Sequence, residues 1–402
     1  MNLRGCCTEQ TVKPLFDAGL HPISNRFLQA RAEQEALFPL TVGQCQKSGI
    51  ICLTTPIPPK ELVNRFDWVT YNEPEPHLDH AVELLWDLCN ISENSVVGGI
   101  TFKDDTTLAR FAKRGCKTWR IDIHDDLDIV KKGAGAESIQ MALRTSKTAG
   151  IVKKYGRAHI LIVRHFLEHV YDLAEFTAAL KEMTVDHGYI VFEIPDSTRS
   201  LEKFDYTMLW EEHLYYFTPA TFKIALGVCD FSLVHFESYP YPLENSLVAV
   251  VQPSNHPQSE VSIEIVRQEL ARGERFAEQF DEHCRLLQSF FVDYRRNHGK
   301  IAFLGAGHLA STFIGLFQLQ DFIEFVVDDN PHKQGLFMPG SRLPILSSKA
   351  LVENDISLCL LSSNPLNEEK VIANNQVFVA KGGQFFSIFP ASKHSLHRSG
   401  LL

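Results

Sequence analysis

The chain of 402 residues has no long apolar run and no excess of positive charge. No stretch approaches the ~20 consecutive apolar residues of a membrane-spanning helix. The first ten residues, MNLRGCCTEQ, lack the apolar segment of a secretory signal. Lysine and arginine number 39 against 49 aspartates and glutamates, so the formal net charge is -10. That balance argues against the basic surface of a nucleic-acid-binding protein. We therefore expect neither a membrane nor a nucleic acid as a partner.

Cysteines are few and show no regular spacing. There are nine, an odd number, which favours reduced thiols in a cytoplasmic protein over a disulfide framework. A hydrophobic content of 45% and a charged content of 22% are typical of a globular protein. The length predicts two or three domains. These properties indicate a cytoplasmic enzyme or binding protein.

Strand and helix patterns alternate over residues 76–255, after a proline-rich and turn-rich region. That first region, residues 1–75, predicts a small N-terminal domain without a large core of its own. Alternation of this kind predicts a mostly parallel sheet covered by helices. The expected strands are 94–100, 116–123, 157–166 and 189–196, and the expected helices are 80–91, 106–115 (closed by Gly115) and 173–188.

Residues 256–402 form the third predicted domain. Its first part, 258–298, is highly charged and has apolar residues at helical spacing, which predicts one or two long linking helices. The alternation then restarts with a strand, a glycine loop and a helix in residues 300–317, and further strands are expected in 323–331, 356–363 and 384–390. The fold class is therefore α/β: two Rossmann-like open sheets joined by a helical linker, with a small N-terminal domain.

Two glycine loops follow the first strand of each sheet. The loops are GGITFKDD, beginning at Gly98, and GAGHLA, beginning at Gly305. Glycine permits a tight turn there, and the following helix offers N–H groups to an anion. Asp122 and Asp328 each lie about 20 residues beyond their loop, the spacing of an acid that binds a ribose. The pattern alone leaves NAD, an adenosyl cofactor or no ligand as alternatives.

The segment WEEHLYYFTP, residues 210–219, combines acids, a histidine and aromatic residues after a buried strand. We interpret His213 as a general base beside Glu212. Tyr215 and Tyr216 are candidates to donate to an oxygen that develops negative charge. The alternative is that this segment only packs a loop over the sheet. A second acidic and aromatic cluster, residues 66–80, favours a shared pocket.

A third cluster, RHFLEHVYD at residues 164–172, follows another expected strand. It places His165, Glu168 and His169 near the same edge. The spacing of the last two suggests a metal, but the helix and third ligand of a zinc hydrolase are missing. We therefore predict no metal site from this segment.

Together these stretches resemble the SAM-dependent C-methyltransferases of deoxysugar biosynthesis. RHFLEHVYD, GYIVFEIPD and WEEHLYYFTPATF resemble the central class I methyltransferase domain of that family. LFDAGLHPISNRFL resembles its N-terminal zinc-binding domain. LGAGHLA and VDDNPHKQGLFMPGSRLPI resemble its C-terminal Rossmann-like domain. The resemblance covers nearly the whole chain and implies a methyltransferase of biosynthesis that acts on a small molecule, possibly a nucleotide-sugar.

The resemblance also implies roles for individual residues. His213 is similar to the general base of the family, Glu212 to its neighbour in the site, and Tyr71 to a tyrosine contributed by the N-terminal region. The nucleotide-sugar of family members lies between the central and C-terminal domains. Tyr216 is a further catalytic candidate. The expected cofactor-binding residues are Gly98, Gly99, Lys103, Asp104, Asp122 and His165. The expected substrate-binding residues are Gly305, Gly307, His308, Asp328 and Lys333.

The chain departs from the family pattern at two places. The usual first loop resembles EIGSNDG, where this chain has GGITFKDD. The altered loop either holds SAM by other polar groups, such as Lys103 and Asp104, or has weakened or lost SAM binding. Of the four zinc cysteines of the family, only Cys6 and Cys45 are matched, because Leu3 and Ser48 occupy the other positions. Two thiolates do not make a structural zinc site, so we predict a metal-free remnant.

The function that we predict is SAM-dependent methylation of a carbon next to a carbonyl, through enolisation by His213. Three alternatives remain open from the sequence. They are an O- or N-methyltransferase on the same scaffold, an NAD(P)-dependent oxidoreductase that uses GAGHLA, and a non-catalytic protein that binds SAM or a nucleotide.

Overall fold

The computed structural model describes residues 7, 10–66, 68–69, 73–131, 134–254 and 262–398. The chain forms two compact units, each made of several segments. Unit 1 comprises residues 1–14, 42–198 and 212–273, and unit 2 comprises residues 15–41, 199–211 and 274–402. Within the described residues, no helix combines the length and apolar composition that crossing a membrane requires.

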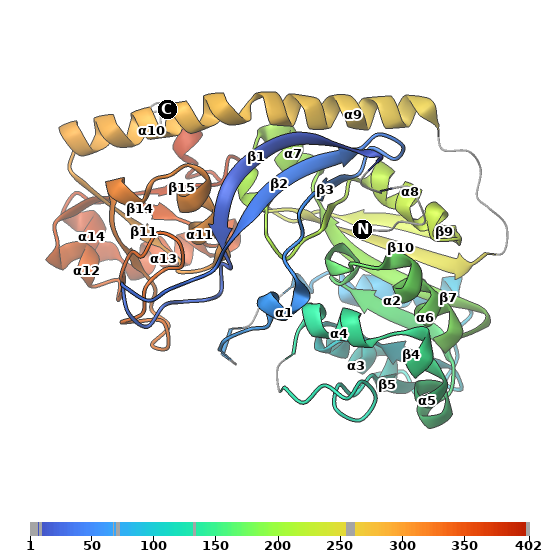
Figure 1. Ribbon diagram of the computed structural model, residues 1–402. Helices are drawn as coiled ribbons and strands as arrows, with labels where there is room; N and C mark the ends of the chain where they lie inside the picture. The colour runs from blue at the N-terminus through green and yellow to red at the C-terminus, as the bar shows by residue number, and fades with distance from the viewer. Residues whose placement is uncertain are drawn as a thin grey trace. The chain divides into compact units, whose positions relative to one another are not determined.

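Unit 1 contains a six-stranded sheet in the order β5-β4-β6-β7-β10-β9 (Figure 1, teal to yellow). The strands β5, β4, β6 and β7 are parallel to one another, and β10 is antiparallel to both β7 and β9. The strands are β4 (Val96–Gly99), β5 (Lys117–Arg120), β6 (Ala158–Arg164), β7 (Thr184–Asp196), β9 (Phe231–Tyr239) and β10 (Asn245–Pro253).

Helices cover both faces of this sheet because its strands are apolar on both sides. Alternate residues of β6 separate accordingly. Ile160 and Ile162 pack with α2 (Leu78–Leu88) and α3 (Asp105–Lys113). Leu161 and Val163 belong to the opposite core, with residues of α5 (Thr145–Tyr155), α6 (Leu173–Met183) and α8 (Pro219–Val228). The remaining helices of this region are α1 (Pro59–Leu62) and α4 (Ala136–Ala142).

Unit 2 contains a five-stranded parallel sheet in the order β13-β12-β11-β14-β15 (Figure 1, orange and red). One of its faces packs on Leu351 and Phe378, from two short helices. The strands are β11 (Lys300–Leu304), β12 (Ile323–Val327), β13 (Ile345–Leu346), β14 (Ile356–Leu361) and β15 (Gln384–Ser387), and the helices are α11 (His308–Leu316), α12 (Ala350–Glu353), α13 (Glu368–Asn374) and α14 (Gln376–Ala380).

A four-stranded sheet and two long helices complete the fold. The sheet has the order β1-β2-β3-β8, from β1 (Val12–Pro22), β2 (Leu37–Cys45), β3 (Ile51–Leu53) and β8 (Tyr215–Tyr216). The charged segment forms α9 (Ile263–Glu278) and α10 (Phe280–Asn297), and α7 (Thr198–Lys203) follows β7. The α/β class, with two open sheets and a helical linker, is therefore confirmed.

The structure also corrects the predicted elements. Helix 173–188 was predicted too long, since α6 ends at Met183 and β7 begins at Thr184. The β-branched pair Thr184 and Val185 favours a strand, and His187 takes a left-handed φ of 62° that no helix tolerates. The antiparallel pair β9 and β10 was not predicted. The domain limits 1–75, 76–255 and 256–402 stay a prediction.

Candidate active site

The glycine loop of unit 1 turns directly from β4 into a 3₁₀ turn, Phe102–Asp104, and then into α3. A methyl group on Gly98 would come within 2.5 Å of the Trp119 ring. One on Gly99 would come within 2.9 Å of Leu108 and 3.0 Å of Asp104. Both glycines are therefore required by packing inside the unit, whether or not a ligand approaches them.

Asp104 closes this loop from within. Its Oδ2 accepts hydrogen bonds from the backbone N–H groups of Ile100 (2.7 Å) and Thr101 (2.8 Å). Its Oδ1 accepts one from the N–H of Arg164 at 2.9 Å. Burial raises the pKa of this carboxyl to about 6, against the lowering effect of these hydrogen bonds. Asp104 thus shapes the loop and takes the N–H groups that would otherwise face a ligand.

Lys103 belongs to a group of charged residues at the carboxyl edge of the sheet. Its Nζ lies 2.6 Å from Glu73 and donates to the His165 carbonyl at 3.2 Å. The His165 ring lies 3.1 Å from Glu193, 3.6 Å from Glu73 and 3.9 Å from Glu168. Burial alone would lower the pKa of His165, but the charges of these carboxylates raise it. The predicted residues Lys103 and His165 are therefore brought together.

Arg164 and Glu193 form a buried ion pair at this edge. They are directly opposite each other in the register of β6 and β7, and Arg164 Nε lies 2.5 Å from Glu193 Oε2. Arg164 also donates to the carbonyls of Lys103 (2.6 Å) and Pro74 (3.2 Å). Sequence reasoning did not select this pair. The sequence signal for this ion pair is a basic residue and an acidic residue near the ends of two consecutive apolar strand patterns.

His213 lies beside the LEH segment, residues 167–169. One ligand-type atom from each of Glu168, His169 and His213 lies within 4.8 Å of the others. The rings of His169 and His213 are edge to face, with centroids 4.7 Å apart. Glu168 and His169 are buried and His213 is half-buried. From the sequence, only Glu168 and His169 were expected to be neighbours. The fold brings His213 next to them as a third possible metal ligand.

Burial controls the protonation of this group. It raises the pKa of Glu168 to about 7. It lowers the pKa of His169 to about 3, with Lys103 adding to the effect, so His169 is neutral at pH 7. His169 Nδ1 lies 2.9 Å from the Glu212 carbonyl oxygen, which accepts only. Nδ1 therefore carries the proton, and Nε2 carries the lone pair.

The tyrosines of WEEHLYYFTP form strand β8. Tyr216 pairs with Ile51 of β3 and is buried, and its ring centroid lies 6.4 Å from that of His213. Tyr215 is buried in the core of unit 1, where burial raises its pKa well above the ordinary value. The segment therefore packs in the core through Tyr215 and lies near His213 through Tyr216. Tyr71, the other expected tyrosine, lies outside the described residues.

Asp122 follows β5 and is exposed. Its Oδ1 accepts hydrogen bonds from the backbone N–H groups of His124 and Asp125, both at 2.9 Å. These bonds lower its pKa. The position at the carboxyl end of the strand next to β4 is that of a ribose-binding acid.

The GAGHLA loop of unit 2 is held by its own acid. Asp328 Oδ2 accepts from the Ala306 N–H at 3.0 Å and from Lys333 Nζ at 2.9 Å. Gly305 has a left-handed φ of 107°, and Gly307 precedes α11. His308, at the start of α11, stacks on Trp210 with centroids 4.4 Å apart. Four of the five residues predicted for this site, Gly305, Gly307, Asp328 and Lys333, thus belong to the loop and the acid that holds it. The fifth, His308, contacts Trp210.

The cysteines near the N-terminus lie in the core of unit 1. Cys7, Cys45 and Cys52 are all buried there, and Cys7 Sγ lies 3.5 Å from Ser48 Oγ. Burial, with Cys45 nearby, raises the pKa of the Cys52 thiol to about 12. Cys6, one of the two positions that match the family, lies outside the described residues.

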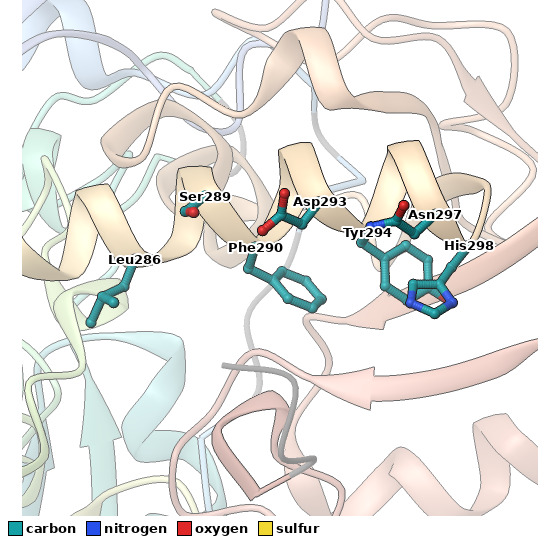
Figure 2. Close-up of a pocket in the computed structure, with 7 residues that line it drawn as sticks. All are labelled: Leu286, Ser289, Phe290, Asp293, Tyr294, Asn297 and His298. Atoms are coloured by element: carbon teal, nitrogen blue, oxygen red, sulfur yellow. The ribbon is translucent and has the colours of Figure 1, made fainter.

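One hollow of about 210 Å³ lies along α10 in unit 2. Figure 2 shows that the labelled residues that line it follow α10, with His298 directly after its last residue. They include Leu286, Phe290 and Tyr294, and none is a predicted site residue. Among the described residues, its lining therefore includes none of the groups at the carboxyl edge of the unit 1 sheet.

Comparison with known proteins gives two similarities in sequence. Residues 252–390 match the family model of the C-methyltransferase C-terminal domain. The chain is 22% identical over 391 residues to the C-methyltransferase NovU of Streptomyces niveus, covering 92% of this chain and 91% of that protein.

Solved structures of methyltransferases are also similar. The 1,6-didemethyltoxoflavin-N1-methyltransferase of Burkholderia thailandensis is 12% identical, with 45% of this chain and 80% of that chain covered at a TM-score of 0.31. The magnesium protoporphyrin IX methyltransferase of Synechocystis PCC 6803 is 13% identical, with 46% and 90% covered at a TM-score of 0.31. At such scores these likenesses carry no weight in the assignment. The family model over residues 252–390 and the relative of similar length both support a relationship between this chain and C-methyltransferases.

Proposed function

We propose that the protein methylates a carbon next to a carbonyl in a small molecule, such as a nucleotide-sugar, with His213 as the general base. The observation that carries this proposal is the place of His213. It is half-buried and lies against Glu168 and His169, in the same unit as the contact between Lys103 and His165. Removal of the proton by His213 gives an enolate whose carbon then attacks the donor methyl group.

The methyl group of SAM is already activated by its sulfonium, so the protein has two tasks. One is to hold the donor and the substrate carbon in line, which can contribute up to about 7–11 kcal/mol in well-oriented systems. The other is to take the proton, which typically adds roughly 10²- to 10⁴-fold. Glu212 fixes the tautomer of His169 through its carbonyl. Tyr216 and Tyr71 are proposed to bond the developing oxyanion.

The hydrogen bonds of the glycine loop favour a donor without phosphate over a dinucleotide. SAM carries a sulfonium and an ammonium group and has no phosphate, whereas the pyrophosphate of NAD needs free N–H groups at the glycine loop. Asp104 already takes two of these N–H groups. We propose that the donor binds at Gly98, Gly99, Lys103, Asp104, Asp122 and His165, with Asp122 on the ribose and Asp104 acting through the loop.

We propose that the C-terminal domain, residues 256–402, binds the substrate. Lys333 offers a positive charge beside the GAGHLA turn, which suits a diphosphate. The proposed contacts are Gly305, Gly307, His308, Asp328 and Lys333. We also propose that residues 1–75 are the remnant of a zinc-binding domain and that residues 76–255 are the methyltransferase domain.

Calorimetric titration with SAM, S-adenosylhomocysteine and NADH in parallel tests the cofactor assignment. We expect both adenosyl ligands to bind and NADH not to bind. Asp122→Asn should weaken SAM by about 10-fold, since a hydrogen bond to a charged group contributes about 1.5–3 kcal/mol. The asparagine keeps the side-chain oxygen that caps the turn. Asp125→Asn removes a neighbouring exposed acid and should leave affinity unchanged. Tight NADH binding without SAM binding would overturn the proposal.

A further inference from the structure

Glu168, His169 and His213 form a cluster that the transfer of a methyl group does not require as a whole. Each of the three offers one atom of the kind that binds metals, and these atoms lie within 4.8 Å of one another. Two imidazoles and one carboxylate are a common ligand set for transition metals in proteins. The three come from two separate segments, which is why neither motif showed the set by itself.

The carboxylate of Glu168 provides an independent sign of a ligand. Its side chain is 2% exposed, and Oε2 is buried without a hydrogen-bond partner. A buried carboxylate oxygen left in this state costs free energy, because it has lost water and gained nothing. Unsatisfied buried atoms are uncommon in native proteins and call for an explanation such as an ion.

The hydrogen bond of His169 is the second sign. Metal-binding histidines usually donate their other ring N–H to a carbonyl or carboxylate, which fixes the tautomer and the ring orientation. His169 makes this bond to the Glu212 carbonyl at 2.9 Å. This bond occupies Nδ1 and leaves Nε2 as the ring nitrogen able to bind a metal.

We propose that Glu168, His169 and His213 bind a divalent transition-metal ion such as Zn²⁺, with its remaining coordination positions open. Ligand atoms of a tetrahedral zinc site with bonds of ~2.1 Å lie roughly 3.4 Å apart. Closing from 4.8 Å or less thus needs side-chain movements of about 1 Å. His213 is half-buried, so the ion has access from solvent. Lys103, a cation near the cluster, is paired with Glu73 at 2.6 Å, which offsets part of its positive charge.

The effect of a bound metal on catalysis rests on the proposed function of His213 as the base. An ion on His213 takes the lone pair that would remove the substrate proton, so metal binding and base catalysis exclude each other. Zn²⁺ should therefore inhibit methyl transfer in the wild-type protein. Binding itself does not depend on that function and is measured without donor or substrate.

Titration of the metal-stripped full-length protein with Co²⁺, followed by visible absorption, tests the site. We expect one Co²⁺ per chain with d–d bands and no thiolate-to-cobalt charge-transfer band, which separates this site from the buried cysteines. Glu168→Gln and His213→Gln should each weaken Co²⁺ by at least the roughly 10- to 100-fold that loss of a supporting partner costs in metal sites.

The matched control is Glu369→Gln. Glu369 is an exposed carboxylate 2.8 Å from His394, a glutamate–histidine pair in the other unit. Its loss should leave Co²⁺ affinity unchanged. Affinity that is equal in Glu168→Gln and wild type, a thiolate band at the first equivalent, or no Co²⁺ spectrum at all would overturn the proposal. If Co²⁺ binds as expected but Zn²⁺ does not inhibit, the metal site stands and the role of His213 as base falls.

Discussion

Replacement of His213 by alanine is expected to lower the rate of methyl transfer by roughly 10²- to 10⁴-fold, the usual contribution of a positioned general base. Binding of SAM should be nearly unchanged, since the proposed donor contacts come from β4, β5 and the segment after β6. His213 is half-buried on a loop, so its loss removes little packing. The measurement is single-turnover transfer of labelled methyl, with calorimetry of SAM on the same sample.

A control separates loss of the base from loss of structure. His235→Ala removes a partly exposed histidine of β9, at the far edge of the same sheet, and should keep full activity. Added imidazole should restore part of the rate of His213→Ala, because the cavity left by the side chain admits a free base. Undiminished turnover in His213→Ala would remove this residue from the mechanism.

Replacement of Arg164 by methionine is the second large effect. The change leaves the buried Glu193 without the guanidinium that lies 2.5 Å away. It also leaves the carbonyls of Lys103 and Pro74 without their donor. Removing one partner of a buried ion pair typically costs about 3–5 kcal/mol, because the remaining charge stays desolvated. We expect a loss of that size in the free energy of unfolding, measured by urea denaturation.

Arg110→Met is the matched change at an exposed pair. Arg110 Nε lies 2.7 Å from Asp79, whose side chain is 83% exposed. A pair of this kind contributes about 0–1 kcal/mol. Arg164→Met should therefore lower the free energy of unfolding by several times more than Arg110→Met. Equal losses would show that the buried pair does not hold the ends of β6 and β7 together.

Much of the fold follows from the sequence because both sheets have strands that are apolar on both faces. Residues 158–164 and 356–361 are such runs, and each becomes a central or near-central strand. The errors occur where periodicity is ambiguous. Residues 184–188 continue the helical pattern of α6 for one turn, yet they begin β7 because that strand pairs with β6 from Ala158 onward. Pairing with β6 and the strand preference of the β-branched residues there together prevail over the helical periodicity.

The candidate site was predictable only in part. The sequence pointed to His213, Lys103 and His165 because charged residues after buried strands gather at one sheet edge. It could not show why Gly98 is a glycine, since the Trp119 ring that fills the space comes from the neighbouring strand. It also could not join Glu168 to His213, which are brought together only by the fold.

The most direct test of the central claim is a crystal structure of the protein with S-adenosylhomocysteine. The account predicts the ribose on Asp122 and the donor sulfur facing the same cavity as the His213 imidazole, with room between them for one substrate carbon. A His213 ring walled off from the bound ligand, or a ligand bound away from the edge formed by β4 and β6, would contradict it.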